Sequence, residues 1–238
     1  MQQSRILLLI GALAAAAIVV VVLIVVGSNG GSGRATTTTA ATTTSTTATA
    51  PTAASIFAGV PQHGDTLGKA NAAVTLTVYE DPQCPFCAQW NLQTLPTVIE
   101  RYIKPGRIKL VYRGVEIIGP NSVPGLRAIY AAGAQNKLWP LVEQLYLHQG
   151  GENSGWITPA AIRAAATAAG ANGKAILAAS GSSGVTAALK QAETGATAIN
   201  LQGTPTFVVE RPPGLPQQLS VPALDPASFI PALDAALQ

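Results

Sequence analysis

The chain contains two cysteines, Cys84 and Cys87, which lie three positions apart in the stretch EDPQCPFCAQW (80–90). Cysteine pairs at this spacing supply half of a zinc site, form a short structural disulfide, or act as a dithiol that is oxidised and reduced in turn. The pair alone does not distinguish these uses. The rest of the sequence must indicate the compartment, the local structure and the partners.

The two structural uses of the pair have little support. A zinc site needs two more ligands, and the two histidines of the chain, His63 and His148, do not have the spacing of zinc ligands. We expect His63 in a loop, His148 at the end of a helix, and no metal. A disulfide across so short a loop stabilises a domain by about 2 kcal/mol, against about 3 kcal/mol for a loop of about 15 residues. The redox use is therefore favoured.

The cysteines follow a predicted strand and begin a predicted helix. The segment VTLTVY (74–79) is rich in β-branched residues, which favours a strand. The segment after the cysteines has apolar residues at helical spacing, and Pro96 within it should kink or split the helix. A turn at Pro105-Gly106 leads into a second predicted strand, IKLVYRGVEI (108–117). The cysteine pair therefore lies in the first loop of a βαβ unit.

The segment from about 121 to 201 is rich in alanine and has helical character. We predict four helices there, separated by glycine-rich turns: Leu126–Ala134, Leu138–His148, Pro159–Ala169 and Thr186–Ile199. TFVVE (206–210) and LSV (219–221) are predicted strands, and Asp225 should cap a last helix that runs to about Leu237. The helical block thus separates a βαβ unit from a ββα unit.

A position at the start of a helix suits thiol chemistry. The thiolate is the attacking species, and a free cysteine has a pKa of about 8.5. The unpaired N–H groups and the positive end of the helix dipole should stabilise a thiolate on Cys84. Pro85 suits the first helical turn because it has no N–H to leave unsatisfied. Cys87 lies one turn farther on, close enough to form a disulfide with Cys84.

The motifs DPQCPFC (81–87) and GTPTF (203–207) resemble those of the thioredoxin fold, and the helical block between them resembles the DsbA-like branch. The stretch YLHQGGENSGW (146–156) is similar to the insertion of membrane-anchored bacterial members. The resemblance covers about residues 62–237. It implies an α/β protein, with a thioredoxin domain at 56–238 and an inserted α-helical block at about 121–201. One transmembrane helix and a disordered linker would precede this domain.

The resemblance implies roles for the residues of the cysteine motif. Cys84 and Cys87 would be the catalytic dithiol, with Pro85 and Phe86 as the middle residues that tune it. The strongly oxidising DsbA type carries a histidine where this chain has Phe86. One source of thiolate stabilisation is therefore missing.

Two more positions follow from the resemblance. The Thr204–Pro205 bond would be cis and face the cysteines; Thr204 would offer backbone hydrogen bonds to a substrate peptide, and Pro205 would shape the groove. Thioredoxin-like proteins often bury a carboxylate six residues before the first cysteine, where this chain has Val78. Glu80 has the strand parity of Val78, so it could exchange a proton with Cys87. It could equally be solvated at the end of the strand.

The N-terminal residues predict a membrane anchor and a tether. Ile6–Val26 is an uncharged span of 21 residues, long enough to cross a bilayer as a helix. A cleaved signal peptide is the alternative, but its apolar region is usually shorter and is followed closely by a cleavage site. With an uncleaved anchor, residues 1–5 would be a short cytoplasmic tail. Residues 27–55, rich in Gly, Ser and Thr, are predicted to be a disordered linker.

Charge gives little sign of a nucleic-acid partner. The chain has 14 basic and 11 acidic side chains, and two of the basic ones precede the domain, which is therefore almost neutral. Five basic residues cluster around the turn at 105–106: Arg101, Lys104, Arg107, Lys109 and Arg113. A solvated helix end and strand edge explain them better than a phosphate-binding patch. We expect no nucleic-acid partner.

The favoured function is that of a membrane-anchored thiol–disulfide oxidoreductase whose catalytic domain lies outside the cytoplasm, in a single-pass protein of the cell membrane. We expect it to oxidise thiol-containing secreted or membrane proteins, as a monomer without a cofactor. The resemblance implies a membrane quinone-linked reoxidant of the DsbB or vitamin-K-epoxide-reductase type. One alternative is an extracytoplasmic reductase, for instance in cytochrome c maturation. Another is a non-catalytic peptide-binding chaperone or metal carrier.

Overall fold

The computed structural model describes residues 56–238. The expected tail (1–5), anchor Ile6–Val26 and linker (27–55) lie outside the described residues. Within them, none of the helices is long and apolar enough to cross a membrane.

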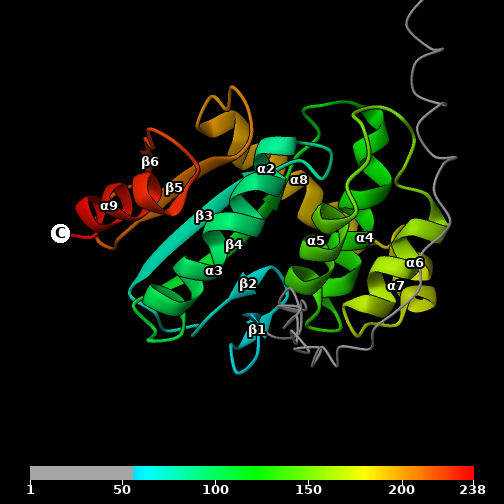
Figure 1. Cartoon of the computed structure of the whole chain (residues 1–238), viewed down its shortest axis with the longest axis horizontal. Coiled ribbons are helices and arrows are strands. Elements are labelled where there is room, and N and C mark those ends of the chain that lie inside the picture. Colours follow the sequence, from blue (N-terminus) through cyan, green and yellow to red (C-terminus); the bar gives the residue numbers. More distant parts are fainter. Residues whose placement is uncertain (1–55) are drawn as a thin grey trace, which may run out of the picture. The chain divides into compact units, whose positions relative to one another are not determined.

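The centre of the fold is a mixed sheet with the strand order β1-β2-β4-β3-β5-β6 (Figure 1). The central strand β3 (Val74–Glu80) pairs in parallel with β4 (Ile108–Gly114) and antiparallel with β5 (Thr206–Glu210). The edge strands are β1 (Gln62–His63) and β6 (Gln217–Leu219), and β2 (Thr66–Leu67) lies between β1 and β4. His63 therefore lies in a short edge strand, and its predicted place in a loop is wrong.

One long helical stretch runs from Pro85 to Ile103 and crosses the sheet in Figure 1. Its consecutive segments are α2 (Pro85–Gln89), η1 (Trp90–Thr94), α3 (Leu95–Val98) and η2 (Ile99–Ile103), of which η1 and η2 are π-helical. Pro96 lacks an N–H, and the turn before it is wider, with the N–H of Leu95 donating to the carbonyl of Trp90. The proline therefore changes the pitch of the helix instead of ending it.

Strand β4 ends earlier than predicted. The sequence indicated a strand to residue 117, but β4 stops at Gly114. The N–H groups of Ile117 and Ile118 donate to the carboxylate of Asp81, at 2.8 and 2.9 Å. Because these N–H groups are bound to a side chain, the backbone leaves the sheet.

The helical insertion contains five helices where the sequence predicted four. They are α4 (Val123–Gly133), α5 (Leu138–Leu147), α6 (Pro159–Ala168), α7 (Gly173–Ala179) and α8 (Ser183–Ala198). The unpredicted helix α7 is short and is capped by Asn172, whose side chain accepts from the N–H of Ala175. Helix α8 starts before Thr186 because the Ser182 side chain caps it.

The C-terminal unit has the predicted order. Strand β6 starts two residues earlier than the predicted strand at 219–221. The last helix is α9 (Pro226–Ala236), and the Asp225 side chain accepts from the N–H of Ser228 at 3.0 Å. The predicted cap of this helix is confirmed.

Both faces of β3 are covered. On one face lie the fully buried Leu76 and Val78, beneath the long helix. On the other face Tyr79 packs against Ala192 of α8. A Cβ atom on Gly195, a residue of α8, would lie 2.5 Å from the Tyr79 hydroxyl oxygen. A glycine at 195 therefore lets α8 approach the sheet closely.

Two aromatic clusters hold these layers together. Trp90 lies 5.0 Å from Phe207 and 5.9 Å from Phe229 between ring centroids, which joins the long helix, β5 and α9. Tyr112 lies 5.9 Å from Trp139, which joins β4 to α5 of the insertion. The insertion is therefore packed against the sheet through its own aromatic core.

Truncation of the first cluster should be costly. We expect Phe229→Ala to lower the free energy of unfolding by about 3–5 kcal/mol, because a large, fully buried ring is lost and a cavity remains. The matched control is Leu215→Ala, since Leu215 is 81% exposed and its loss should change stability by less than about 0.5 kcal/mol. Urea unfolding measures both values. Equal effects would contradict this account of the core.

Candidate functional site

The turn between β3 and α2 carries the cysteine pair. Cys84 is the N-cap residue of α2, with extended backbone angles, and Pro85 occupies the first helical position. Cys87 follows within the first turn. Both thiols are free and buried, with 3% of Cys84 and none of Cys87 exposed.

The Cys84 thiol has a lowered pKa of about 6. The largest cause is a hydrogen bond with the Cys87 side chain, which stabilises the thiolate. Burial opposes this shift, and the Thr204 side chain and the N–H groups of Cys87 and Phe86 add to it. The N–H groups at the start of the helix therefore act as the sequence suggested, but the second cysteine contributes most.

The Cys87 thiol is shifted in the opposite direction. Burial raises its pKa well above the usual value, and its hydrogen bond with Cys84 and the negative charges of Glu80 and Cys84 raise it further. In the reduced pair, one sulfur therefore carries the negative charge and the other keeps its proton.

The Thr204–Pro205 segment completes the front of the site. Its peptide bond is cis, as the resemblance implied. The sulfur of Cys84 lies 3.2 Å from the carbonyl oxygen of Thr204, a residue 120 positions away in the chain. The loop before β5 thus faces the cysteines.

Glu80 lies behind the pair and is fully buried, so its predicted alternative as a solvated residue is wrong. One carboxylate oxygen accepts from the Asn91 side chain at 2.7 Å, and the other accepts from the Tyr146 hydroxyl at 3.1 Å. Burial raises the pKa of Glu80 to about 8, although both hydrogen bonds act against the rise. Glu80 is therefore an acid that is largely protonated at neutral pH.

Asp81 organises the loops around the site, a role that the sequence did not reveal. Its fully buried carboxylate accepts from the N–H of Gln83 at 2.8 Å and from the Ser122 hydroxyl at 2.6 Å, besides the N–H groups of Ile117 and Ile118. Asp81-Pro82 looked like an ordinary strand boundary. The Gln83 N–H is a local donor, and only the folded chain brings the other three donors to Asp81.

The helical insertion reaches the cysteines through residues that the sequence also did not reveal. Gln149 donates from its side chain to the carbonyls of Pro82 and Cys84, at 3.0 and 3.1 Å. The N–H of Asn153 donates to the Gln83 side chain at 2.7 Å. Gln149, Asn153 and Tyr146 all lie in the stretch 146–156. Its polar side chains were the available signal, but sequence alone does not show where they point.

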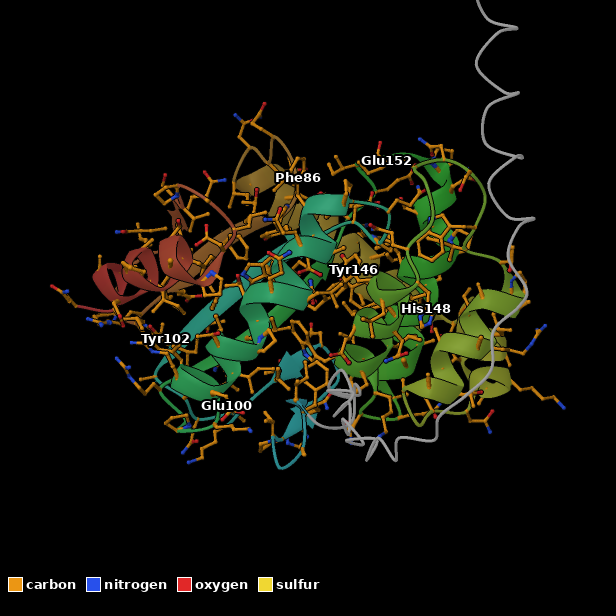
Figure 2. The ribbon with its side chains drawn as sticks, in the orientation of Figure 1. Phe86, Glu100, Tyr102, Tyr146, His148 and Glu152 are labelled. Atoms are coloured by element: carbon orange, nitrogen blue, oxygen red, sulfur yellow. The ribbon has the colours of Figure 1, made fainter. Side chains whose placement is uncertain are left out.

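The remaining predicted residues lie apart from this network. Phe86 is 60% exposed and lies near the start of α2 at the edge of the molecule, whereas Tyr146 lies inside it (Figure 2). His148 follows the end of α5, where Nδ1 of its ring donates to the carbonyl oxygen of Gln144 at 2.9 Å. Across residues 56–238 no group of His, Cys, Asp and Glu side chains is arranged to hold a metal ion.

Comparison with known proteins agrees with this architecture. Residues 62–212 match the thioredoxin family. A protein described as "Probable disulfide bond formation protein D" from Bacillus cereus is 33% identical over 95 residues, which are 39% of this chain and 44% of that protein. Its Bacillus anthracis counterpart is 32% identical over 96 residues. The matched segment spans less than half the length of these curated relatives.

Solved structures share the fold. BdbD from Bacillus subtilis matches with a TM-score of 0.62 and 18% identity, over 75% of this chain and 95% of that one. DsbA from Chlamydia trachomatis matches with a TM-score of 0.57 and 19% identity, over 74% and 90%. The predicted thioredoxin fold with a helical insertion is confirmed. The chain therefore belongs to the thioredoxin family and has the DsbA-like fold, in which helices are inserted between the βαβ and ββα units.

Proposed function

We propose that this protein is a thiol–disulfide oxidoreductase that introduces disulfides into other proteins. The observation that carries the proposal is the opposite shift of the two cysteine pKa values within one helical turn. A structural staple has no need for this asymmetry, whereas a redox pair needs one attacking thiolate and one protonated thiol. The relatives described as disulfide bond formation proteins support the same direction.

The reaction begins with the Cys84–Cys87 disulfide. A substrate thiolate attacks the sulfur of Cys84, a bond forms between these two sulfurs, and Cys87 leaves as a thiolate. Cys87 then takes a proton, for which the buried acid Glu80 is the candidate donor. A second thiolate of the substrate attacks the substrate sulfur of the mixed disulfide. The substrate leaves oxidised, and Cys84 keeps the electron pair as a thiolate.

The site favours oxidation of the substrate because it stabilises the reduced pair. With its pKa lowered to about 6, Cys84 is mostly thiolate at pH 7, and this ionisation is lost when the disulfide forms. The linkage relation gives on the order of 1 kcal/mol of stabilisation of the reduced form at pH 7, equivalent to a few tens of millivolts for a two-electron couple. We therefore place the potential between those of thioredoxin and DsbA, roughly −270 to −120 mV.

The partners and location belong to the same proposal. Thiol-containing secreted or membrane proteins would be the substrates, and a membrane quinone-linked protein of the DsbB or vitamin-K-epoxide-reductase type would reoxidise the pair. The uncharged span Ile6–Val26 supports an anchor that holds the domain outside the cytoplasm, at the cell membrane.

The first prediction concerns the acidity of Cys84. In the reduced protein, alkylation by iodoacetamide should modify Cys84 first, with a pH midpoint near 6, because only the thiolate reacts. The rate should be full above the midpoint and fall as pH drops through it. Cys87→Ala should raise the midpoint, since the largest stabilising hydrogen bond is lost, whereas Cys87→Ser keeps a donor and should raise it less. A midpoint near 9 in the wild type would contradict the proposed site.

The second prediction tests catalysis. The wild type should oxidise a reduced peptide that carries two cysteines, and each single-cysteine variant should fail. Cys87→Ser should accumulate mixed disulfides with cell proteins on non-reducing gels, because no resolving thiol remains, and Cys84→Ser should accumulate almost none. Wild-type oxidation no faster than that by Cys84→Ser would refute the oxidase. A reduction potential below that of thioredoxin would favour the reductase alternative.

The third prediction concerns the anchor. The full-length protein should remain in the membrane fraction after a carbonate wash, because its apolar span matches the thickness of the bilayer. Recovery of a soluble mature form that begins after residue 26 would show cleavage instead.

A further inference from the structure

The hydroxyl of Tyr146 has two acceptors at equal distance. Its oxygen lies 3.1 Å from Oε2 of Glu80 and 3.1 Å from the carbonyl oxygen of Asp81. A phenol has one hydrogen, so it can donate to one of these oxygens at a time. Tyr146 is 4% exposed, so no bulk solvent competes for this hydrogen.

The other carboxyl oxygen of Glu80, Oε1, accepts from a side-chain amide, which donates a hydrogen bond whether or not Glu80 is ionised. The side-chain amide of Asn91 donates to Oε1 of Glu80 at 2.7 Å and also to the carbonyl of Cys87 at 3.1 Å. Because Oε1 accepts this hydrogen, the proton of a neutral Glu80 belongs on Oε2, the oxygen that faces Tyr146. The oxygen of Glu80 that gains and loses the proton therefore lies next to the Tyr146 hydroxyl, which has two possible acceptors.

We propose that Tyr146 is a positioning residue for proton transfer, whose hydroxyl turns between two acceptors as Glu80 gains and loses its proton. When Glu80 is neutral, Oε2–H donates to the Tyr146 oxygen, and Tyr146 donates to the Asp81 carbonyl. When Glu80 is ionised, the Tyr146 hydroxyl turns and donates to Oε2. Both arrangements use the same positions of the heavy atoms.

The carbonyl of Asp81 tolerates this exchange. It also accepts from the backbone N–H of Cys84 at 3.0 Å, so it keeps a partner when the Tyr146 hydroxyl turns away. A buried carbonyl left without any donor would cost free energy. The second bond removes that cost and ties the Asp81 carbonyl to the reacting cysteine.

This inference rests on the proposed function. When the Cys84–Cys87 bond opens, the electron pair remains on Cys87, and in the proposed function Glu80 gives up its proton to that sulfur, whose charge interacts with the Glu80 carboxylate. The carboxylate that remains is fully buried, and in residues 56–238 the ion pairs use other carboxylates, those of Asp65, Glu100 and Asp234. Neutral donors must therefore stabilise it, and Tyr146 supplies one when the charge forms.

In the part of the chain that the structure describes, no other titratable group around Glu80 donates a hydrogen bond to its carboxylate. Four titratable groups interact with the charge of Glu80, and they lie on β4, at the start of α2 and on α5: Cys84, Cys87, Tyr112 and Tyr146. Tyr112 is fully buried like Glu80, but its hydroxyl has no hydrogen-bond partner. It provides a matched control, a second buried phenol near Glu80 that does not bind the carboxylate.

The test is a titration of Glu80 in the reduced full-length protein, followed by the ¹³C signal of its carboxyl carbon. In Tyr146→Phe the midpoint should rise by about one pH unit, because a hydrogen bond to the charged form is about twice as strong as one to the neutral form. In Tyr112→Phe the midpoint should stay within a few tenths of a unit. An unchanged midpoint in Tyr146→Phe, or an equal shift in both variants, would overturn the proposal.

A second measurement leaves Tyr146 in place and so does not depend on the folding of the Phe variant. The ¹³Cζ signal of Tyr146 should show a step near pH 8 as its hydroxyl changes acceptor, at the midpoint of Glu80. In Glu80→Gln this step should vanish, and its absence from the wild type would overturn the proposal. Neither titration needs a substrate. A protein that shows both signals but oxidises no thiols would refute the proposed function and leave the role of Tyr146 standing.

Discussion

The site depends on the burial of two adjacent carboxyl groups at the end of β3. Glu80 and Asp81 are both fully buried, and a buried carboxyl group must find hydrogen-bond donors. Successive residues of a strand point to opposite sides, so the two groups recruit different surroundings. Glu80 takes donors from the long helix and from α5, whereas Asp81 takes them from the loop after β4 and from Ser122. The turn that carries Cys84 is built on these bonds.

The pKa values of the two cysteines are shifted in opposite directions because the residues occupy different positions at the start of α2. Cys84 caps the helix and meets N–H groups that favour a thiolate. Cys87 lies one turn inside, where burial and nearby negative charges favour the thiol. In the reduced pair, the hydrogen bond between the two cysteine side chains reinforces both shifts, because the proton on Cys87 stabilises the negative charge on Cys84.

The helical insertion is part of the site and not only a cover for the sheet. Trp139 packs against the sheet, Tyr146 reaches Glu80, and Gln149 reaches the carbonyl of Cys84. All three lie on α5 or directly after it. A change in the packing of α5 would therefore alter the acid behind the cysteines as well as the turn that holds them. This couples the stability of the insertion to the redox chemistry.

The sequence by itself determined the features that depend on near neighbours in the chain. Residue type and spacing control four features, which could therefore be predicted: the strand before the cysteines, the helix that starts at Pro85, the cap at Asp225 and the order of the two units. Helix α7 was missed because seven residues give too short a periodic pattern. The end of β4 was missed because a distant carboxylate, not a local signal, ends it.

The tertiary structure decided which of the candidate residues share a site and in which state they exist. Glu80 could have been solvated by its sequence position, and its burial became evident only when α5 and the long helix closed over it. Tyr146 and Gln149 gave no local sign of their targets, since their partners lie more than sixty residues away. The sequence thus determined that a dithiol begins a helix. The folded chain decided its acidity, because desolvation and long-range hydrogen bonds exist only after the packing is complete.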